Sequence, residues 1–301
     1  MSQVSKIFVG ILTGLLSVAI LIGYADLPVS SSFSIPAEGI VHFSGDKPSK
    51  QTAEPDAITV VSYNIGYASG LKNNLPVFLS KAEVLQNLDA MIATLKTLKP
   101  DLLFLQEVDF NSARTYGINQ MEYLARGLET PYAAYVVTWN KRYVPWPYWP
   151  PKTHFGRMLS GQAVLSRFPI LQQETVPFPK PKSNPFWYNW FYLNRILQNI
   201  SVQARGHVWH VWNAHLEAFD APTRAEQVLK LADHIHQEKG TLLAVGDYNE
   251  DPGMFLKDFA QTGLEIDHIY YTQPLLLRRR GHFTIEASDH FPVWAQFQIL
   301  R

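Results

Sequence analysis

The sequence predicts an α/β fold, because strand-like segments alternate with helical segments along the chain. Short apolar runs that end in a polar residue recur at residues 60–64, 102–107, 208–215 and 241–245, and such runs are typical of buried strands. Segments with apolar residues at helical spacing lie between them. This alternation fits a doubly wound parallel sheet as well as a sandwich of two sheets.

The N-terminal residues are typical of a targeting segment. Lys6 precedes an uncharged apolar run at residues 7–24, whose length fits a long signal peptide or a membrane span of roughly 17–25 residues. We expect residues 1–25 to be a signal peptide or a membrane anchor, and the protein to be exported, either to the cell envelope or outside the cell. Residues 26–56 carry Ser, Pro, Gly and Lys without periodicity, and we interpret them as a linker.

Three helices are predicted after the linker. A capping box at residues 80–83 begins the first, apolar residues follow at helical spacing, and Pro100 ends it. A second capping box at residues 223–226 begins another helix, which Gly240 closes. A shorter helix is expected at residues 120–128.

Polar side chains stand where the predicted strands end. Asp247 and Asn249 follow the strand at residues 241–245, and because they are two residues apart they point to the same side. Polar pairs of this kind often lie in a cleft at the edge of a sheet, although Gly, Asp, Asn and Pro also form surface turns. The polar residues at the other strand ends are Asn64, Glu107, Asn213 with His215, and Asp289 beside His290. Together these groups supply oxygen ligands for Mg²⁺ and two imidazoles for proton transfer or phosphate contact.

Length and composition are consistent with one domain. The chain has 301 residues, of which 47% are hydrophobic, enough for one large core over residues 57–301. Its formal net charge is zero, so the overall charge does not indicate a partner. It has no cysteine, which excludes disulfides, thiolate metal sites and a cysteine nucleophile.

Six motifs follow one another in a fixed order: SYNIG, QEVD, NAHLE, GDYNEDP, IDHIY and SDHFP. In this order they resemble the endonuclease/exonuclease/phosphatase superfamily, which has the DNase I-like fold. The resemblance extends over residues 58–298. It implies a four-layer sandwich of two mixed β-sheets with helices on the outside, and it therefore favours the sandwich over the doubly wound sheet.

The resemblance also implies which residues bind metal. Glu107 resembles the carboxylate that binds Mg²⁺, with Asn64 as its neighbour. Asp289 resembles a ligand of the metal or of a water in the cleft. Carboxylate and amide oxygens are the ligands that Mg²⁺ prefers, and Mn²⁺ is the alternative ion.

The catalytic roles are implied in the same way. Asp247 resembles the carboxylate that orients or deprotonates the attacking water, and Asn249 resembles an amide that contacts phosphate or metal. His290 resembles a catalytic histidine whose imidazole is fixed by Asp267. His215 resembles a second catalytic histidine, which donates to the phosphate or to the leaving group; no carboxylate that orients it can be identified from the sequence.

Residues 139–195 are expected to determine substrate specificity. They hold five of the eight tryptophans and eight Lys or Arg residues against one Glu, and their prolines predict two irregular loops. We expect Trp149 and Trp187 to bind substrate, with Arg157 and Asn213 as candidate contacts. The loops could lie at a membrane interface or stack on nucleic-acid bases, unless their aromatic residues pack beneath them as a small core.

The predicted function is therefore that of a metal-dependent hydrolase of phosphodiester bonds, exported or membrane-anchored. Its substrate would be a phospholipid head group, or a nucleic acid if the protein is an endonuclease or exonuclease of DNase I type. A non-catalytic, membrane-attached binding module is a second alternative, but the intact set of polar residues argues against it. Membrane contact is expected through the N-terminal segment and the two aromatic, basic loops, and the protein is expected to be a monomer.

Overall fold

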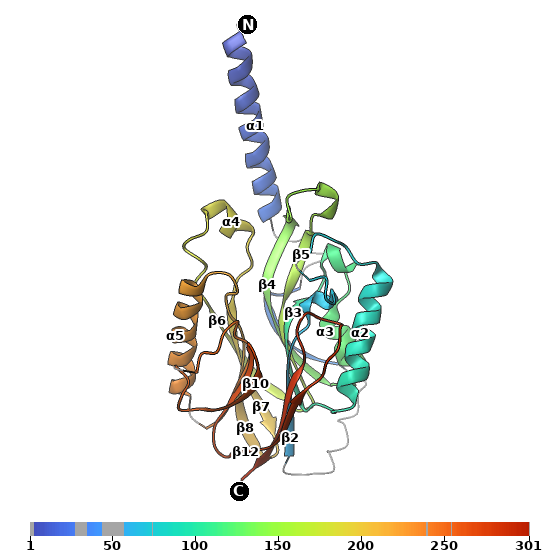
Figure 1. Cartoon of the computed structure of the whole chain (residues 1–301), viewed down its shortest axis with the longest axis vertical. Helices are drawn as coiled ribbons and strands as arrows, with labels where there is room; N and C mark the ends of the chain where they lie inside the picture. Colours follow the sequence, from blue (N-terminus) through green and yellow to red (C-terminus); the bar gives the residue numbers. More distant parts are fainter. Residues whose placement is uncertain are drawn as a thin grey trace.

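The computed structural model describes residues 3–27, 35–43, 57–73, 75–238, 240–253 and 255–300. Two β-sheets face each other, and helices cover their outer sides (Figure 1). The core between the sheets includes Ile58 and Phe104 from one sheet and Trp209 and Val211 from the other. The layers therefore run helix, sheet, sheet, helix, as in a DNase I-like sandwich, and a doubly wound single sheet is excluded.

The first sheet has seven strands. In spatial order they are β1 (Glu38–His42), β4 (Tyr132–Val144), β5 (Gly156–Ser166), β3 (Leu102–Asp109), β2 (Ala57–Asn64), β13 (Val293–Ile299) and β12 (Leu275–His282). Only β2 and β3 run parallel to each other; the other neighbours are antiparallel.

The second sheet has six strands. In spatial order they are β10 (Ala260–Leu264), β11 (Asp267–Tyr271), β9 (Thr241–Asp247), β8 (His207–His215), β7 (Ile196–Ala204) and β6 (Ile170–Pro177). Here β8 and β9 are the parallel pair. Both sheets are mixed, as the resemblance implied.

Helices α2 (Lys81–Lys96) and α3 (Gln120–Gly127) cover the seven-stranded sheet, and α5 (Ala221–Gln237) covers the other. The alternation of side chains explains the layers: Val61 and Tyr63 pack in the core under α2, whereas Ile58 and Val60 pack between the sheets. The remaining short helical segments are α4 (Phe186–Phe191) and three 3₁₀ turns, η1 (Gly66–Ala68), η2 (Ala113–Thr115) and η3 (Pro151–Thr153).

One of the two predicted capping boxes is confirmed. The Ser80 hydroxyl accepts from the Glu83 backbone N–H, and the Glu83 carboxylate accepts from the Ser80 N–H at 2.7 Å. The box predicted at residues 223–226 is wrong, because α5 already begins at Ala221. Asp220 caps that helix by accepting from the Thr223 N–H at 3.0 Å, and a proline in the first turn suits this start.

The structure also corrects two interpretations of irregular segments. The linker prediction is wrong at residues 38–42, which form β1 and pair with β4; residues 28–34 and 44–56 lie outside the described residues. The loops of residues 139–195 are more regular than predicted. β4 continues to Val144, and Pro185 directly precedes α4, where its fixed φ suits a helix start.

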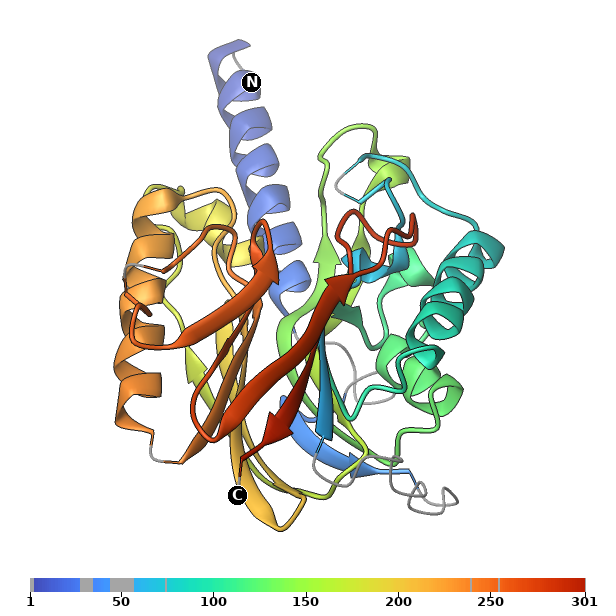
Figure 2. The same cartoon turned by 60° about the horizontal axis from the view of Figure 1, so that its bottom comes forward.

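Helix α1 (Gln3–Asp26) projects from one end of the sandwich (Figures 1 and 2). Its segment Ile7–Ala25 is long and apolar enough to cross a membrane, judged by length and composition. This is consistent with both a signal peptide and an anchor, and the choice between them stays a prediction.

Candidate active site

The candidate site lies where strands from both sheets end. β2 and β3 run parallel, so Asn64 lies beside Gln106, the neighbour of Glu107. β8 and β9 run parallel in the facing sheet, so His215 lies opposite Asp247. Because the two sheets pack face to face, the polar ends of four strands meet at one end of the sandwich.

A cavity of about 540 Å³ opens at this end. Its polar lining consists of Asn73, Glu107, Arg114, Arg195, His215, Asp247, Asn249, Asp289 and His290. Tyrosine, tryptophan, phenylalanine and aliphatic side chains form the rest of its wall. Six of the residues predicted from the sequence thus line a single cavity: Glu107, His215, Asp247, Asn249, Asp289 and His290.

Gly246 explains how Asp247 reaches this position. Its φ is +150°, and a Cβ at this residue would lie 1.9 Å from the carbonyl oxygen of Ala214 on β8. Only glycine therefore allows β8 and β9 to pair so closely next to the site. On the other side of β9, Asp267 of β11 pairs directly opposite Asp247, which brings the two carboxylates together.

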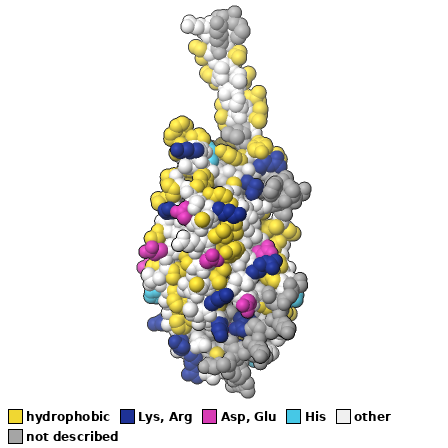
Figure 3. Space-filling view, turned by 90° about the vertical axis from the view of Figure 1, so that its right-hand side faces the viewer, with side chains coloured by type: hydrophobic (Ala, Val, Ile, Leu, Met, Phe, Trp, Pro, Cys, Tyr) yellow, Lys and Arg dark blue, Asp and Glu magenta, His cyan; other side chains and the backbone are white. Residues whose placement is uncertain are grey.

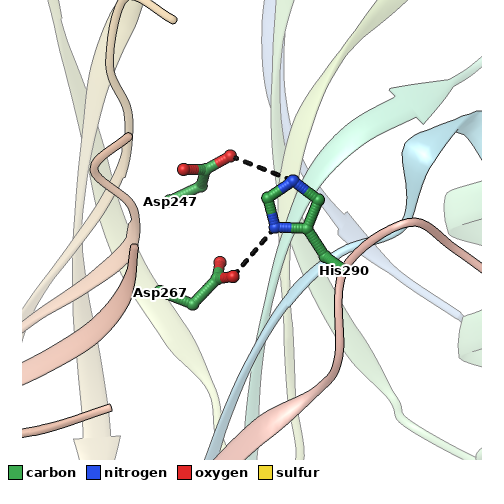
Figure 4. Close-up of side chains that lie close together, drawn as sticks. All are labelled: Asp247, Asp267 and His290. Atoms are coloured by element: carbon green, nitrogen blue, oxygen red, sulfur yellow. Dashed lines mark hydrogen bonds and ion pairs between the residues drawn. The ribbon is translucent and has the colours of Figure 1, made fainter. Parts of the chain in front are cut away.

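His290 lies between these carboxylates (Figure 4). Its Nδ1 is 2.8 Å from Asp267 Oδ2, and its Nε2 is 3.7 Å from Asp247 Oδ2. Burial alone would lower the pKa of His290, but the hydrogen bond and charge of Asp267, with the charge of Asp247, raise it to about 10. His290 is therefore a cation at neutral pH, and the predicted pairing with Asp267 is present.

The pKa values of Asp247 and His215 are shifted in opposite directions. Burial, followed by the charge of Asp267, raises the pKa of Asp247 to about 6. Burial, followed by the positive charges of Arg195 and His290, lowers the pKa of His215 well below its ordinary value. The Nε2 atom of His215 lies 3.5 Å from Asp247 Oδ2 and 3.8 Å from Glu107 Oε1. One imidazole is thus charged and the other neutral, which is typical of sites with divided acid and base roles.

Glu107 is turned into the cavity by an irregularity in β3. The register between β3 and β5 shifts between Leu105 and Val108. Glu107 has a φ of +53°, a left-handed backbone conformation that residues other than glycine rarely adopt. The Asn73 amide donates to Glu107 Oε2 at 3.0 Å and to both oxygens of Asp289 at 3.2 Å. Burial, followed by the charge of Asp289, raises the pKa of Glu107.

These two carboxylates fit a divalent cation. They face one amide nitrogen, and the charge of Asp289 helps to raise the pKa of Glu107, an effect that a cation between the two carboxylates would relieve. Their oxygens are hard ligands of the kind that Mg²⁺ and Mn²⁺ prefer. Asp247, Asp267 and His290 also place ligand atoms within 4.8 Å of one another, but the raised pKa of His290 disfavours the neutral imidazole that a metal ligand requires.

Asn64 is buried and is not among the residues that line the cavity, and its predicted role as a metal ligand stays a prediction. Its Oδ1 accepts from the Gly66 N–H at 3.0 Å, whereas its Nδ2 donates to Asp247 Oδ2 at 2.9 Å. It therefore presents a nitrogen to the catalytic groups and fixes Asp247. Asn249 lines the cavity as predicted; its backbone N–H donates to Asp247 Oδ1, and its side-chain amide donates to the Leu216 carbonyl.

Two predicted substrate contacts are wrong in position. Asn213 is fully buried: its Oδ1 accepts from Gln106 at 2.7 Å, and its Nδ2 donates to the carbonyl oxygen of Leu105, so it joins the two sheets. Arg157 donates to the backbone and side-chain oxygens of Asn111 and is not among the residues that line the cavity.

The tryptophans of residues 139–195 do not share one environment. Trp139 is buried and lines the cavity, so the interpretation that aromatic residues pack beneath the loops holds for this one. Trp149 and Trp187 are 78% and 44% exposed and lie outside the cavity lining. Their predicted contact with substrate stays a prediction.

Arg195 was not predicted from the sequence. This residue is buried, and its Nε and Nη1 atoms have no hydrogen-bond partner among the described residues; Glu217 Oε2 is 3.9 Å from Nε. It shares a small recess of the cavity with Glu107 and His215. A buried guanidinium with unused donors is suited to bind a phosphate oxygen. In the sequence it is one cation among eight, and nothing distinguishes it from the others.

Comparison with known proteins identifies similar chains. The sequence profile of the Endonuclease/Exonuclease/phosphatase family matches residues 61–290, about three quarters of the chain. By sequence comparison, no curated protein gives a significant match. Three similar solved structures show the same fold at low sequence identity. An endonuclease/exonuclease/phosphatase from Beutenbergia cavernae is 19% identical, with a TM-score of 0.60 over 81% of this chain and 72% of that one.

The second is the mannosyl-6-phosphatase of Bacteroides thetaiotaomicron, which is 15% identical, with a TM-score of 0.55 over 80% of this chain and 99% of that one. The third is the catalytic domain of human Nocturnin with a bound sulfate anion. It is 14% identical, with a TM-score of 0.56 over 87% of this chain and 97% of that one.

Proposed function

Because the chain belongs to the endonuclease/exonuclease/phosphatase family, we propose that it is an exported, divalent-metal-dependent hydrolase of phosphodiester bonds. The observation that carries this proposal is the arrangement of three titrating groups around one point of the cavity. Asp247 lies between the protonated imidazole of His290 and the neutral imidazole of His215, and Glu107 faces Asp289 beside them.

Each group has a step that its protonation state suits. Above its pKa of about 6, Asp247 orients a water molecule and takes one of its protons as the water oxygen attacks phosphorus. His290 donates a hydrogen bond from Nε2 to a phosphoryl oxygen and stabilises its negative charge. The bond from phosphorus to the ester oxygen breaks, and the leaving oxygen takes a proton from solvent.

Metal and further donors complete the electrostatic stabilisation. A divalent cation held by Glu107 and Asp289 would neutralise charge on the phosphoryl oxygens. Arg195 supplies fixed guanidinium donors in the recess that it shares with Glu107. His215 remains neutral and accepts or donates one hydrogen bond near Glu107.

A substrate panel tests the proposal. The full chain in detergent would be assayed with Mg²⁺, Mn²⁺ or EDTA on a small phosphodiester, a small phosphomonoester, plasmid DNA, RNA and a phospholipid. We expect at least one substrate to be cleaved with Mg²⁺ or Mn²⁺ but not with EDTA. Asp247→Asn should lower that rate by about 10²-fold or more. Asp258→Asn, at a side chain that is 72% exposed, is the matched control and should not change it.

The proposal fails if the wild-type protein cleaves every substrate no faster than Asp247→Asn does, or if EDTA leaves the rate of cleavage unchanged. The first result would leave the non-catalytic binding module as the remaining interpretation.

A further inference from the structure

The C-terminal end of α1 packs against the domain. Ala25 is fully buried, and the Leu27 carbonyl accepts from the backbone N–H of Arg142 on β4 at 3.2 Å. The Arg142 guanidinium lies 5.2 Å from the ring centroid of Tyr24. A helix joined in this way to a strand of the seven-stranded sheet is part of the folded protein, so we treat α1 as a retained anchor.

Residues 7–20 of α1 are all exposed and do not pack against the domain. Ile7, Phe8 and Leu15 are each more than half exposed, and the apolar window of the helix is not buried by the domain. A helix that is apolar on all sides needs an apolar surrounding, and a bilayer supplies it.

Exposed aromatic side chains lie at the same end of the molecule as α1. The connection from β4 to β5 carries Trp149, which is 78% exposed, and the α4 segment carries Phe186 and Trp187. Figure 1 places both segments beside the base of α1, and Figure 3 shows hydrophobic side chains with Lys and Arg at the end of the body below the helix. We name Trp149, Phe186 and Trp187 the aromatic rim. Tryptophan among basic residues is typical of a membrane interface.

The cavity continues this apolar character towards the catalytic groups. Thirteen of its lining residues are aromatic or apolar, among them Trp139, Tyr148, Phe155 and Phe191. Tyr148 and Phe155 come from the connection between β4 and β5, and Phe191 comes from α4, so three of the four belong to the segments that carry the aromatic rim; Trp139 lies on β4. A substrate whose phosphate reaches Asp247 and His290 would therefore place an apolar group against this wall.

The charged residues of 139–195 give less support to a nucleic acid as the substrate than to a lipid. Lys182 pairs with Glu226 at 2.8 Å, and Lys180 donates to the carbonyl oxygens of Asn189 and Tyr192. Arg195 is buried inside the cavity. The excess of positive charge counted along residues 139–195 is thus partly used within the fold, whereas a polynucleotide needs cations along its backbone.

We propose that the cavity opens onto the bilayer that holds α1, and that the substrate is an amphiphilic phosphate ester embedded in that bilayer. The substrate class rests on the proposed hydrolase function, whereas the membrane contact of the aromatic rim does not. The anchor holds the catalytic groups at the membrane surface, and the apolar wall receives the part of the substrate next to its phosphate.

Hydrolysis in nanodiscs tests the substrate class. The full chain would be inserted into nanodiscs of equal parts phosphatidylcholine and phosphatidylglycerol, and cleavage of the embedded lipids compared with cleavage of a small soluble phosphodiester and of a single-stranded oligonucleotide. The triple variant Trp149→Ser, Phe186→Ser, Trp187→Ser should cleave embedded lipid about tenfold more slowly or worse. Its rate on the soluble ester should be unchanged, because no rim residue lines the cavity.

The matched control replaces exposed apolar residues elsewhere with serine: Leu171, Val208 and Leu229. It should match the wild type on both substrates. The proposal is overturned if the rim variant loses soluble and embedded activity equally, or if the oligonucleotide is cleaved and the lipids are not. Absence of activity on every ester would instead refute the hydrolase function, and with it the substrate class.

Fluorescence tests membrane contact without any hydrolysis. α1 contains no tryptophan, so quenching of tryptophan by brominated lipids reports the domain and not the anchor. We expect quenching in the wild type and a clear loss of it in Trp149→Phe, Trp187→Phe. Equal quenching in both proteins would show that the aromatic rim does not touch the bilayer.

Discussion

Removing the charge of Asp267 should shift the pH profile of the enzyme. Asp267 accepts from His290 at 2.8 Å and, with Asp247, holds the pKa of His290 at about 10 against the lowering effect of burial. In Asp267→Asn the hydrogen-bonding shape is kept but the charge is lost. The pKa of His290 should then fall towards the ordinary value of 6.5.

The size of the effect follows from the two pKa values. At pH 8 a histidine with a pKa of about 10 is almost fully protonated, whereas with a pKa of 6.5 only about one molecule in thirty carries the proton. In the proposed mechanism His290 acts as a cation, so kcat at pH 8 should fall about 30-fold. Asp267 also raises the pKa of Asp247, the proposed base, so the acid limb of the pH profile, near pH 6, should move to lower pH. Both limbs therefore shift in the same direction.

The assay is kcat for a small soluble phosphodiester, measured from pH 5 to 10 with saturating Mg²⁺. Asp258→Asn serves as control, because its carboxylate is exposed and lies outside the cavity lining. A loss of equal size at every pH would refute the reasoning, since it would mean that Asp267 only positions the imidazole. The reasoning would also be refuted if both limbs of the pH profile stayed at their wild-type pH values.

Three other substitutions separate catalytic, binding and structural roles. Glu107→Gln should abolish stimulation by Mg²⁺, with a loss of about 10²-fold or more and little change in melting temperature; full stimulation would show that the metal is held elsewhere. Arg195→Lys should lower kcat/KM about tenfold or more while the fold is kept, because a guanidinium donates in a fixed fork; an unchanged kcat/KM would remove Arg195 from the site. Asn213→Ala should lower the free energy of unfolding by about 2–4 kcal/mol, because it leaves buried partners such as Gln106 unsatisfied. Its kcat/KM should stay near the wild-type value, and loss of activity at unchanged stability would restore the substrate contact expected from the sequence.

Much of the site could be predicted because it depends on strand ends. The apolar runs located β2, β3, β8 and β9, and the polar residue after each run marked the edge of the sheet where these strands meet. For that reason Glu107, His215 and Asp247 could be identified from the sequence, whereas His290 was identified from the SDHFP motif before the last strand; all four line the cavity. The alternation of strands and helices along the chain did not distinguish one sheet from two. Only the family resemblance favoured two sheets.

The errors have physical causes that a linear sequence does not reveal. Asn213 and His215 lie on one face of β8, but alternation gives the face and not the depth, and Asn213 lies further inside, between the sheets. The charge count over residues 139–195 overlooked partners from outside that segment, such as Glu226 for Lys182. Arg195 could not be distinguished because its importance comes from burial beside Glu107.

The most direct test of the metal-dependent site is the position of a bound cation. Crystals of the full chain soaked in MnCl₂ would be measured for anomalous scattering by manganese. We expect a peak bound by the carboxylates of Glu107 and Asp289, and none at the Asp247, Asp267 and His290 cluster. A peak within that cluster, or no peak beside Glu107 at saturating manganese, would contradict the site as described.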